Sequence, residues 1–213
     1  IVSCQAREGE PFNAPHFIAE FAKAAALAGA KALRINGRDN IAAVKQVVDL
    51  PVIGIRKRRV DGSPVYITPT LADVQEVIEA GADIVALDGT AGPRPGGEHL
   101  RDLAAYCRKM GVPVMADIAT VEDAMFAVEQ GADLLATTLA GYTEETRGRP
   151  LPAFDLLEEI VALGIGPVLL EGGINRPEYV KQALQLGAHA VVVGKAITMP
   201  HYIAGLYVAQ ASN

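Results

Sequence analysis

The sequence contains no tryptophan and only two cysteines among its 213 residues. Cys4 and Cys107 form neither a disulfide framework nor a metal-binding spacing, so we expect both to be buried packing residues. The four histidines show no metal-ligand spacing either, and no metal site is expected. No Gly-x-Gly-x-x-Gly motif follows an apolar run, and no Gly-x-Ser-x-Gly motif is present. The sequence therefore gives no support to a dinucleotide cofactor or to a serine nucleophile.

Long apolar runs are also missing. None approaches the ~18 to 20 residues of a membrane helix, and no basic segment marks a cleavable leader. The net charge of −6 argues against nucleic acid, whose backbone requires clustered Lys and Arg. A small phosphate ligand stays compatible, because a few backbone N–H groups at a helix N-terminus can hold it. We expect a cytoplasmic protein without a nucleic-acid or membrane partner, and we expect that a few native residues precede Ile1.

A repeat of the dipeptide Gly-Ala organises the chain. Each copy precedes an apolar run that ends in polar residues, and the copies begin at Gly29, Gly81, Gly131 and Gly187. Between them, Pro-Val pairs at Pro51, Pro113 and Pro167 open further apolar runs. Each period of about 52 residues therefore holds two strands, each followed by a helical pattern. Four periods predict eight strands, which is a single-domain (β/α)8 TIM barrel spanning residues 1–213.

Local signals support this division into elements. Thr70 and Thr120 each have an aspartate three residues later, which resembles a capping box and predicts a helix start. The repeated glycines are expected to close helices in the left-handed conformation. Two connections, residues 56–68 and 139–150, are longer than usual for this fold, and Asp61-Gly62 is a hairpin signal within the first. We expect these two to be lids or binding loops, with a decorative role as the alternative.

The fold indicates where chemistry belongs. Active sites of such barrels lie at the carboxyl ends of the strands. The polar residues that close the apolar runs are Ser3, Gln5, Arg34, Asn36, Lys57, Asp88, Asp117, Thr137, Thr138, Glu171, Gly194 and Lys195. This set of donors, carboxylates and lysines favours a polar, anionic small molecule.

The last two strand ends favour phosphate binding. Gly172 and Gly173 follow the seventh strand, and Gly194 follows the eighth. Loops at these positions commonly bind phosphate, and glycine lets the backbone approach its oxygens. Lys195 would add a positive charge. The alternative interpretation is that the glycines only form tight turns that need a positive φ.

Lys57 is the one lysine expected at the end of a central strand, and arginines surround it in the sequence. Strand alternation directs Lys57 to the interior or rim and its neighbours Arg56 and Arg58 to the opposite side. Positive neighbours and burial would lower its pKa, as a general base requires. The alternative is a basic strand end that only steers an anionic substrate.

Three carboxylates end predicted strands: Asp88 ends the fourth, Asp117 the fifth and Glu171 the seventh. A carboxylate across from Lys57 would serve as its ion-pair partner, as the second acid or base, or as a hydrogen-bond acceptor for sugar hydroxyls. A structural ion pair is the alternative for each of the three. The residues alone do not choose among these roles.

Seven motifs along the whole chain resemble the N-acetylmannosamine-6-phosphate 2-epimerase family. They are Ile1-Val2-Ser3-Cys4-Gln5-Ala6, Gly54-Ile55-Arg56-Lys57, Tyr66-Ile67-Thr68-Pro69-Thr70, Ala116-Asp117-Ile118, Gly141-Tyr142-Thr143, Glu171-Gly172-Gly173-Ile174 and Val193-Gly194-Lys195-Ala196-Ile197-Thr198. The resemblance implies interconversion of N-acetylmannosamine-6-phosphate and N-acetylglucosamine-6-phosphate in sialic acid and amino-sugar catabolism, without a metal or organic cofactor. A homodimer is among the assemblies that we expect.

The resemblance also implies roles for individual residues. Lys57 and Glu171 fall on the catalytic positions, and phosphate contacts fall on Gly173 and Gly194. Substrate contacts fall on Gln5, Arg34, Asp117 and Tyr142. The last motif departs from the family pattern, because Lys195 and Met199 stand where the family usually has serine and arginine.

Three other functions are kept as alternatives. One is a thiazole synthase barrel, and another is a ribulose-phosphate epimerase, which would need a metal-binding His/Asp set that the strand ends do not show. The third is a barrel that binds sugar phosphate without catalysis, which the presence of both Lys57 and Glu171 speaks against.

Overall fold

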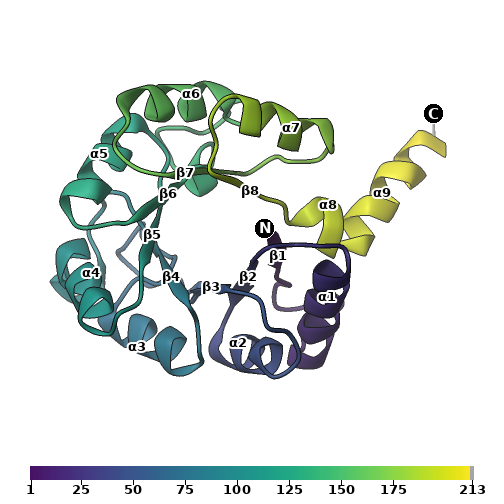
Figure 1. Cartoon of the computed structure of the whole chain (residues 1–213), viewed down its shortest axis with the longest axis horizontal. Coiled ribbons are helices and arrows are strands. Elements are labelled where there is room, and N and C mark those ends of the chain that lie inside the picture. Colours follow the sequence, from purple (N-terminus) through teal and green to yellow (C-terminus); the bar gives the residue numbers. More distant parts are fainter. Residues whose placement is uncertain (212–213) are drawn as a thin grey trace.

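Eight parallel strands follow one another around the sheet in chain order, as the repeat predicts. A computed structural model describes residues 1–211 and confirms the TIM barrel (Figure 1). Residues Val2 and Val193 form a parallel bridge, through which the last strand meets the first. The strands are β1 (Val2–Cys4), β2 (Leu33–Asn36), β3 (Val52–Ile55), β4 (Ile84–Asp88), β5 (Val114–Asp117), β6 (Leu134–Ala136), β7 (Val168–Glu171) and β8 (Ala190–Val192).

Helices α1 to α7 surround the strands, and α8 and α9 follow the last strand (Figure 1). They are α1 (Pro15–Leu27), α2 (Arg38–Lys45), α3 (Leu71–Glu79), α4 (Leu100–Lys109), α5 (Val121–Glu129), α6 (Phe154–Leu163), α7 (Glu178–Gln185), α8 (Lys195–Thr198) and α9 (Pro200–Ala211). Two 3₁₀ turns, η1 (Pro95–Gly97) and η2 (Thr137–Leu139), lie in the connections. The sequence pattern did not predict α9, which leads away from the barrel in yellow (Figure 1) and has no buried residue.

The expected helix boundaries are confirmed. The side chains of Thr70 and Thr120 each accept a hydrogen bond from the backbone N–H three residues later, and the aspartate side chain there accepts one from the threonine N–H. Both threonines therefore begin their helices with complete capping boxes. The four repeated glycines follow helix ends with positive φ between 88° and 101°, at Gly29, Gly81, Gly131 and Gly187.

The hydrophobic core has two layers. The larger one lies between the strands and the helices and includes both free cysteines, which are buried as predicted. The smaller one fills the barrel interior with Ile53, Ile55, Met115, Leu169 and Val192. Because these side chains close the lower barrel, any ligand site must lie above them, at the carboxyl ends of the strands.

The connection after β3 forms a short hairpin, as the Asp61-Gly62 signal predicts. Lys57 and Ile67 form an antiparallel bridge, and the Arg58 N–H donates to the Tyr66 carbonyl at 2.9 Å. Gly62 takes a φ of 80° in the turn between the two legs. The hairpin carries the residues that follow β3 over the mouth of the barrel.

None of the helices in the described residues 1–211 is both long and apolar enough to cross a membrane.

Gly54 in β3 offers a test of how the strand below Lys57 is packed. A Cβ at this position would lie 2.6 Å from both Ala82 Cβ and Val77 Cγ1. We expect Gly54→Ala to lower the free energy of unfolding by about 1 to 3 kcal/mol, because added volume strains a packed core. Gly205→Ala is the matched control, since nothing lies within 4 Å of that Cβ. Urea denaturation of both variants checks this, and equal stability would contradict the packing argument.

Candidate active site

A cavity of about 1310 Å³ opens at the carboxyl ends of the strands. Eight of the ten residues predicted for the site line it, and they come from loops that are far apart in the sequence. They are Gln5, Lys57, Tyr142, Glu171, Gly172, Gly173, Gly194 and Lys195. The fold therefore brings the predicted catalytic pair and the predicted phosphate loops to one space.

Arg34 and Asp117, the other two predicted residues, do not line this cavity. Both side chains are completely buried. Arg34 donates to Asp117 through both terminal nitrogens, at 2.9 and 2.6 Å, and its Nη1 also donates to Glu171 Oε2 at 2.7 Å. Their contact with a substrate stays a prediction. In the structure they contact each other, and Arg34 also holds the Glu171 carboxylate.

The buried arginine stays charged because two carboxylates flank it. Burial alone would lower the pKa of Arg34, but the charges of Asp117 and Glu171 and their hydrogen bonds raise it overall. A buried charge is tolerated when it is paired and hydrogen-bonded in this way. Arg34 is therefore a permanent cation beneath the cavity.

Glu171 ends β7 and presents its carboxylate to the cavity. Burial raises the pKa of Glu171, and the nearby Arg34 cation opposes that rise. Its backbone is fixed by Thr137, whose hydroxyl accepts the Glu171 N–H and donates to the Glu171 carbonyl, both at 3.0 Å. The residue is therefore held at its backbone and at its side chain.

Lys57 reaches into the cavity from the first position of the hairpin leg. Its backbone N–H donates to Asn36 Oδ1 at 2.8 Å, and its side chain makes no ion pair within residues 1–211. Desolvation by the surrounding protein, followed by the Arg34 cation, lowers the pKa of Lys57 to about 8, although Glu171 and Asp117 oppose this. A neutral amine is therefore available near physiological pH, as a general base requires.

The two candidate groups lie on opposite sides of the barrel. Lys57 follows β3 and Glu171 ends β7, and these strands are separated by three others in either direction around the ring. A small molecule bound over the barrel axis would have the amine on one side and the carboxylate on the other.

The arginines that surround Lys57 in the sequence are mostly engaged elsewhere. Arg58 pairs with Asp73 at 2.9 Å and Arg56 with Glu76 at 3.6 Å, while the Arg59 guanidinium lies 4.9 Å from the centre of the Tyr66 ring. Their charges are thus partly neutralised, which weakens the interpretation of this segment as a purely steering surface.

Asp88 takes a different place from the other two candidate carboxylates. Its Oδ1 accepts hydrogen bonds from the Thr90 N–H at 3.1 Å and the Thr90 hydroxyl at 2.7 Å. Asp88 does not line the cavity. Asp88 therefore binds the adjacent loop through Thr90 and does not face the cavity, whereas Glu171 lines the cavity across the barrel from Lys57.

The sequence left two interpretations for the glycines after β7 and β8, tight turns and phosphate binding, and the structure is compatible with both. Gly172 and Gly173 have φ of 110° and 72°, so tight turns do need glycine there. A Cβ on Gly173 would also lie 2.5 Å from Leu151 Cβ. Within residues 1–211, the N–H groups of Gly173 and Gly194 donate to no protein acceptor, and Lys195 makes no ion pair. These donors remain available to an anion in the cavity.

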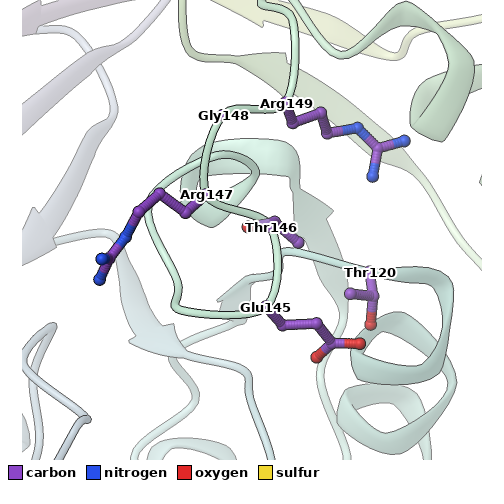
Figure 2. A pocket seen from close by; sticks show the side chains of 6 residues that line it. All are labelled: Thr120, Glu145, Thr146, Arg147, Gly148 and Arg149. Atoms are coloured by element: carbon purple, nitrogen blue, oxygen red, sulfur yellow. The ribbon is translucent and has the colours of Figure 1, made fainter.

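A second hollow of about 460 Å³ lies over the start of α5 and contains no predicted site residue (Figure 2). It is lined by Thr120, Glu145, Thr146, Arg147, Gly148 and Arg149. Figure 2 shows the guanidinium groups of Arg147 and Arg149 pointing away from each other, and Arg149 pairs with Asp155 at 2.7 Å. The long connection 139–150 thus forms this hollow as well as supplying Tyr142 to the main cavity.

No group of three or more His, Cys, Asp or Glu residues in the described part of the chain is arranged to hold a metal ion.

Two residues at strand ends matter more in the structure than the sequence indicated. Asn36 holds the backbone of Lys57, and its amide nitrogen has no protein partner within residues 1–211. Thr138 lines the cavity and donates to Asp117 Oδ1 at 2.5 Å. Their positions at the ends of β2 and β6 were the only signal in the sequence.

Fold and cavity together define a (β/α)8 barrel with a lysine and a carboxylate facing each other across its mouth. A family model described as "Putative N-acetylmannosamine-6-phosphate epimerase" matches residues 18–213. The chain belongs to this family, which confirms the resemblance found in its motifs.

Individual relatives carry nearly the same description as the family model. A "Putative N-acetylmannosamine-6-phosphate 2-epimerase" of Thermosynechococcus vestitus is 50% identical over 212 residues, covering 97% of this chain and 92% of the relative. One of the same description from Caldanaerobacter subterraneus subsp. tengcongensis is 47% identical, covering 98% and 89%. The solved structure of the N-acetylmannosamine-6-phosphate 2-epimerase from Clostridium perfringens is 42% identical with a TM-score of 0.95, covering 98% of this chain and 91% of that one.

The lowered pKa of Lys57 can be measured without any substrate. In ¹³C-methylated protein, we expect one lysine signal to titrate near pH 8, whereas ordinary lysines titrate near 10.4. The amine gains a proton as the pH falls through 8, so the base form is lost below that pH. The Lys57→Met variant should lack this signal, which assigns it. Uniform titration of all lysines above pH 10 would contradict the prediction.

Proposed function

We propose that Lys57 and Glu171 exchange protons with C2 of the substrate in this epimerase, which interconverts N-acetylmannosamine-6-phosphate and N-acetylglucosamine-6-phosphate. The observation that carries the assignment is a lysine without an ion-pair partner in residues 1–211 that lines the cavity across the barrel from a carboxylate. Epimerisation removes a proton from one face of a carbon and returns one to the other. Groups on opposite sides of the substrate suit that requirement.

The reaction begins from the open-chain sugar, whose C1 aldehyde acidifies the proton on C2. Neutral Lys57 takes this proton and becomes an ammonium, and the electron pair of the C–H bond forms an enolate with its charge on the C1 oxygen. Protonated Glu171 then gives its proton to the opposite face of C2 and becomes a carboxylate. Burial, which raises the pKa of Glu171, favours the protonated form that this step needs. Exchange with solvent resets both groups.

Stabilisation of the enolate is the demanding part, since donors aimed at a developing negative charge lower the barrier most. The new Lys57 ammonium is one such group. Asn36 offers a second, because the Lys57 N–H fixes its amide oxygen and leaves the Nδ2 donors without a protein partner in residues 1–211. Gln5 and Tyr142, which also line the cavity, would contact the sugar.

The phosphate would bind between the ends of β7 and β8. Gly172, Gly173 and Gly194 bring backbone close to the cavity, and Lys195 on α8 supplies a cation. The short helix after β8 is a common element of phosphate sites in this fold. Lys195 would thereby take over the charge of the arginine that the family pattern leads us to expect at Met199.

A homodimer and a cytoplasmic location are part of the same proposal. Support for the dimer comes from α9, on which Leu206 and Tyr207 are 51% and 76% exposed. Large apolar side chains gathered on an exposed helix are typical of protein interfaces.

Replacement of Lys57 tests the assigned base. We expect Lys57→Met to lower kcat by a factor of roughly 10² to 10⁴ or more, because general base catalysis alone contributes a factor of this size. Turnover of N-acetylmannosamine-6-phosphate in D₂O, followed by ¹H NMR, reports both epimerisation and exchange at C2. Lys23→Met, at an exposed lysine of α1, is the control that should keep parental activity. A Lys57→Met enzyme within tenfold of the parent would remove Lys57 from the mechanism, and a parent without turnover would favour a binding protein.

The phosphate assignment predicts a change in KM. A charge-assisted hydrogen bond contributes roughly 1.5 to 3 kcal/mol, so Lys195→Ser should raise KM for the phosphorylated sugar about tenfold or more. Adding Met199→Arg should recover part of the loss. The double-mutant cycle is measured at low salt, where screening is weak. Lys181→Ser, on α7 outside the cavity, is the matched control. An unchanged KM in Lys195→Ser would leave the phosphate to backbone groups alone.

A further inference from the structure

Two adjacent threonines after β6 are both connected to Glu171. Thr137 is completely buried and uses its hydroxyl to satisfy both backbone groups of Glu171 at 3.0 Å. Thr138 instead points toward the cavity, which it lines. Both threonines lie in the turn η2. The Thr137 hydroxyl binds the backbone of Glu171, and the Thr138 hydroxyl binds the charged side chains beneath it.

Thr138 contacts the charged network rather than Glu171's backbone. Its hydroxyl donates to Asp117 Oδ1 at 2.5 Å and accepts from Arg34 Nη1 at 3.3 Å. Nη1 is also the nitrogen that binds Glu171 Oε2 at 2.7 Å and Asp117 Oδ1 at 2.9 Å. Nη1 of Arg34 is therefore shared by three acceptors: Asp117, Glu171 and Thr138. Thr138 contacts both Arg34 and Asp117, the buried pair beneath Glu171.

The shared nitrogen makes the position of Glu171 depend on its neighbours. Asp117 Oδ1 and Glu171 Oε2 both accept from Nη1 of Arg34, while Nη2 binds Asp117 alone of the two. The hydrogen bond from the Thr138 hydroxyl to Asp117 Oδ1 partly satisfies this acceptor. Nη1 of Arg34 is then available to hold Glu171. Without that proton, Asp117 would draw the guanidinium toward itself, and the contact to Glu171 would lengthen.

We propose that Thr138 is a positioning residue that keeps the Glu171 carboxylate in place for proton transfer by satisfying Asp117 and Arg34 beneath it. This inference rests on the role proposed for Glu171. Thr138 needs no contact with the substrate for this role, because it acts through the buried pair.

The direction of the expected effect follows from the charges around Glu171. Arg34 from β2 and Lys57 beyond β3 lower its pKa, Asp117 from β5 raises it, and the Ile1 amino group of the adjoining strand end faces it as well. The Thr138 hydroxyl also lowers it. Removing that hydroxyl should therefore raise the pKa of Glu171 further, so that its carboxylate persists only at higher pH.

The experiment compares Thr138→Val, which keeps the shape and loses the hydroxyl, with Thr138→Ser, which keeps the hydroxyl. The pKa of Glu171 is measured in the free enzyme by ¹³C NMR of labelled glutamate side chains, with Glu171→Gln for assignment. We expect a higher pKa in Thr138→Val and a parental value in Thr138→Ser. The kcat/KM of Thr138→Val should fall about tenfold, the usual size for a lost hydrogen bond to a charged group, with the limb that reports Glu171 moved to higher pH.

A mutant cycle tests whether Thr138 acts through Glu171. In a Glu171→Gln background the additional loss from Thr138→Val should disappear, because the group it positions is gone. Thr120→Val, which removes a hydroxyl from the α5 capping box, is the structural control. It should lower stability by the usual effect of a lost cap and leave the Glu171 pKa unchanged.

Different results separate this inference from the proposed function. An unchanged Glu171 pKa in Thr138→Val overturns the positioning role, whatever the activity. Equal losses from Thr138→Val with and without Glu171→Gln also overturn it. Parental turnover in Glu171→Gln would instead remove Glu171 from the mechanism, while the NMR measurement still decides whether Thr138 controls its carboxylate.

Discussion

The buried cation of Arg34 is the constraint on which the rest of the site depends. Taking a guanidinium fully out of water is costly unless its charge is balanced and its N–H groups are bound. Here Asp117 provides a two-point contact and Glu171 a third hydrogen bond, which ties β2, β5 and β7 together beneath the cavity. Loss of either carboxylate would leave the cation undercompensated. The geometry of the proposed catalytic carboxylate is therefore coupled to the stability of the barrel mouth.

The same cation acts on both candidate proton-transfer groups. It lowers the pKa of Lys57 by repulsion, after desolvation has already done so, and it opposes the burial that raises the pKa of Glu171. A carboxylate beside a lysine would ordinarily raise the lysine's pKa and work against its use as a base. Arg34 reduces this conflict, because it forms the direct ion pair with Glu171, and in residues 1–211 the amine has no ion-pair partner. The same fixed charge therefore favours the neutral amine that the proposed base needs, while it favours the ionised form of Glu171, which burial opposes.

Features governed by local chemistry were predictable from the sequence. The Gly-Ala repeat follows from the left-handed turn at each helix end, and the caps at Thr70 and Thr120 need only residues three apart. The contacts of Arg34 were not predictable in this way, because its partners lie 83 and 137 residues further along the chain. Strand ends indicated which residues come near the cavity, but only the register of the sheet decides that Arg34 and Asp117 lie beneath it and that Asp88 contacts Thr90. Helix α9 follows the last strand without any counterpart in the repeat, and so the repeat contained no information about it.

The division of roles between strands and loops explains where this chain can differ from its relatives. The charged network lies on the ends of three strands, where a shift of one residue would turn its side chains to the other face. The proposed phosphate contacts lie on glycine turns and on α8, where backbone N–H groups would supply much of the binding and side chains could vary. Lys195 and Met199, which depart from the family pattern, both belong to this second region, on α8 and immediately after it. If the phosphate binds as proposed, a change of cation there would alter how the anion is held without changing the residues proposed to move the proton.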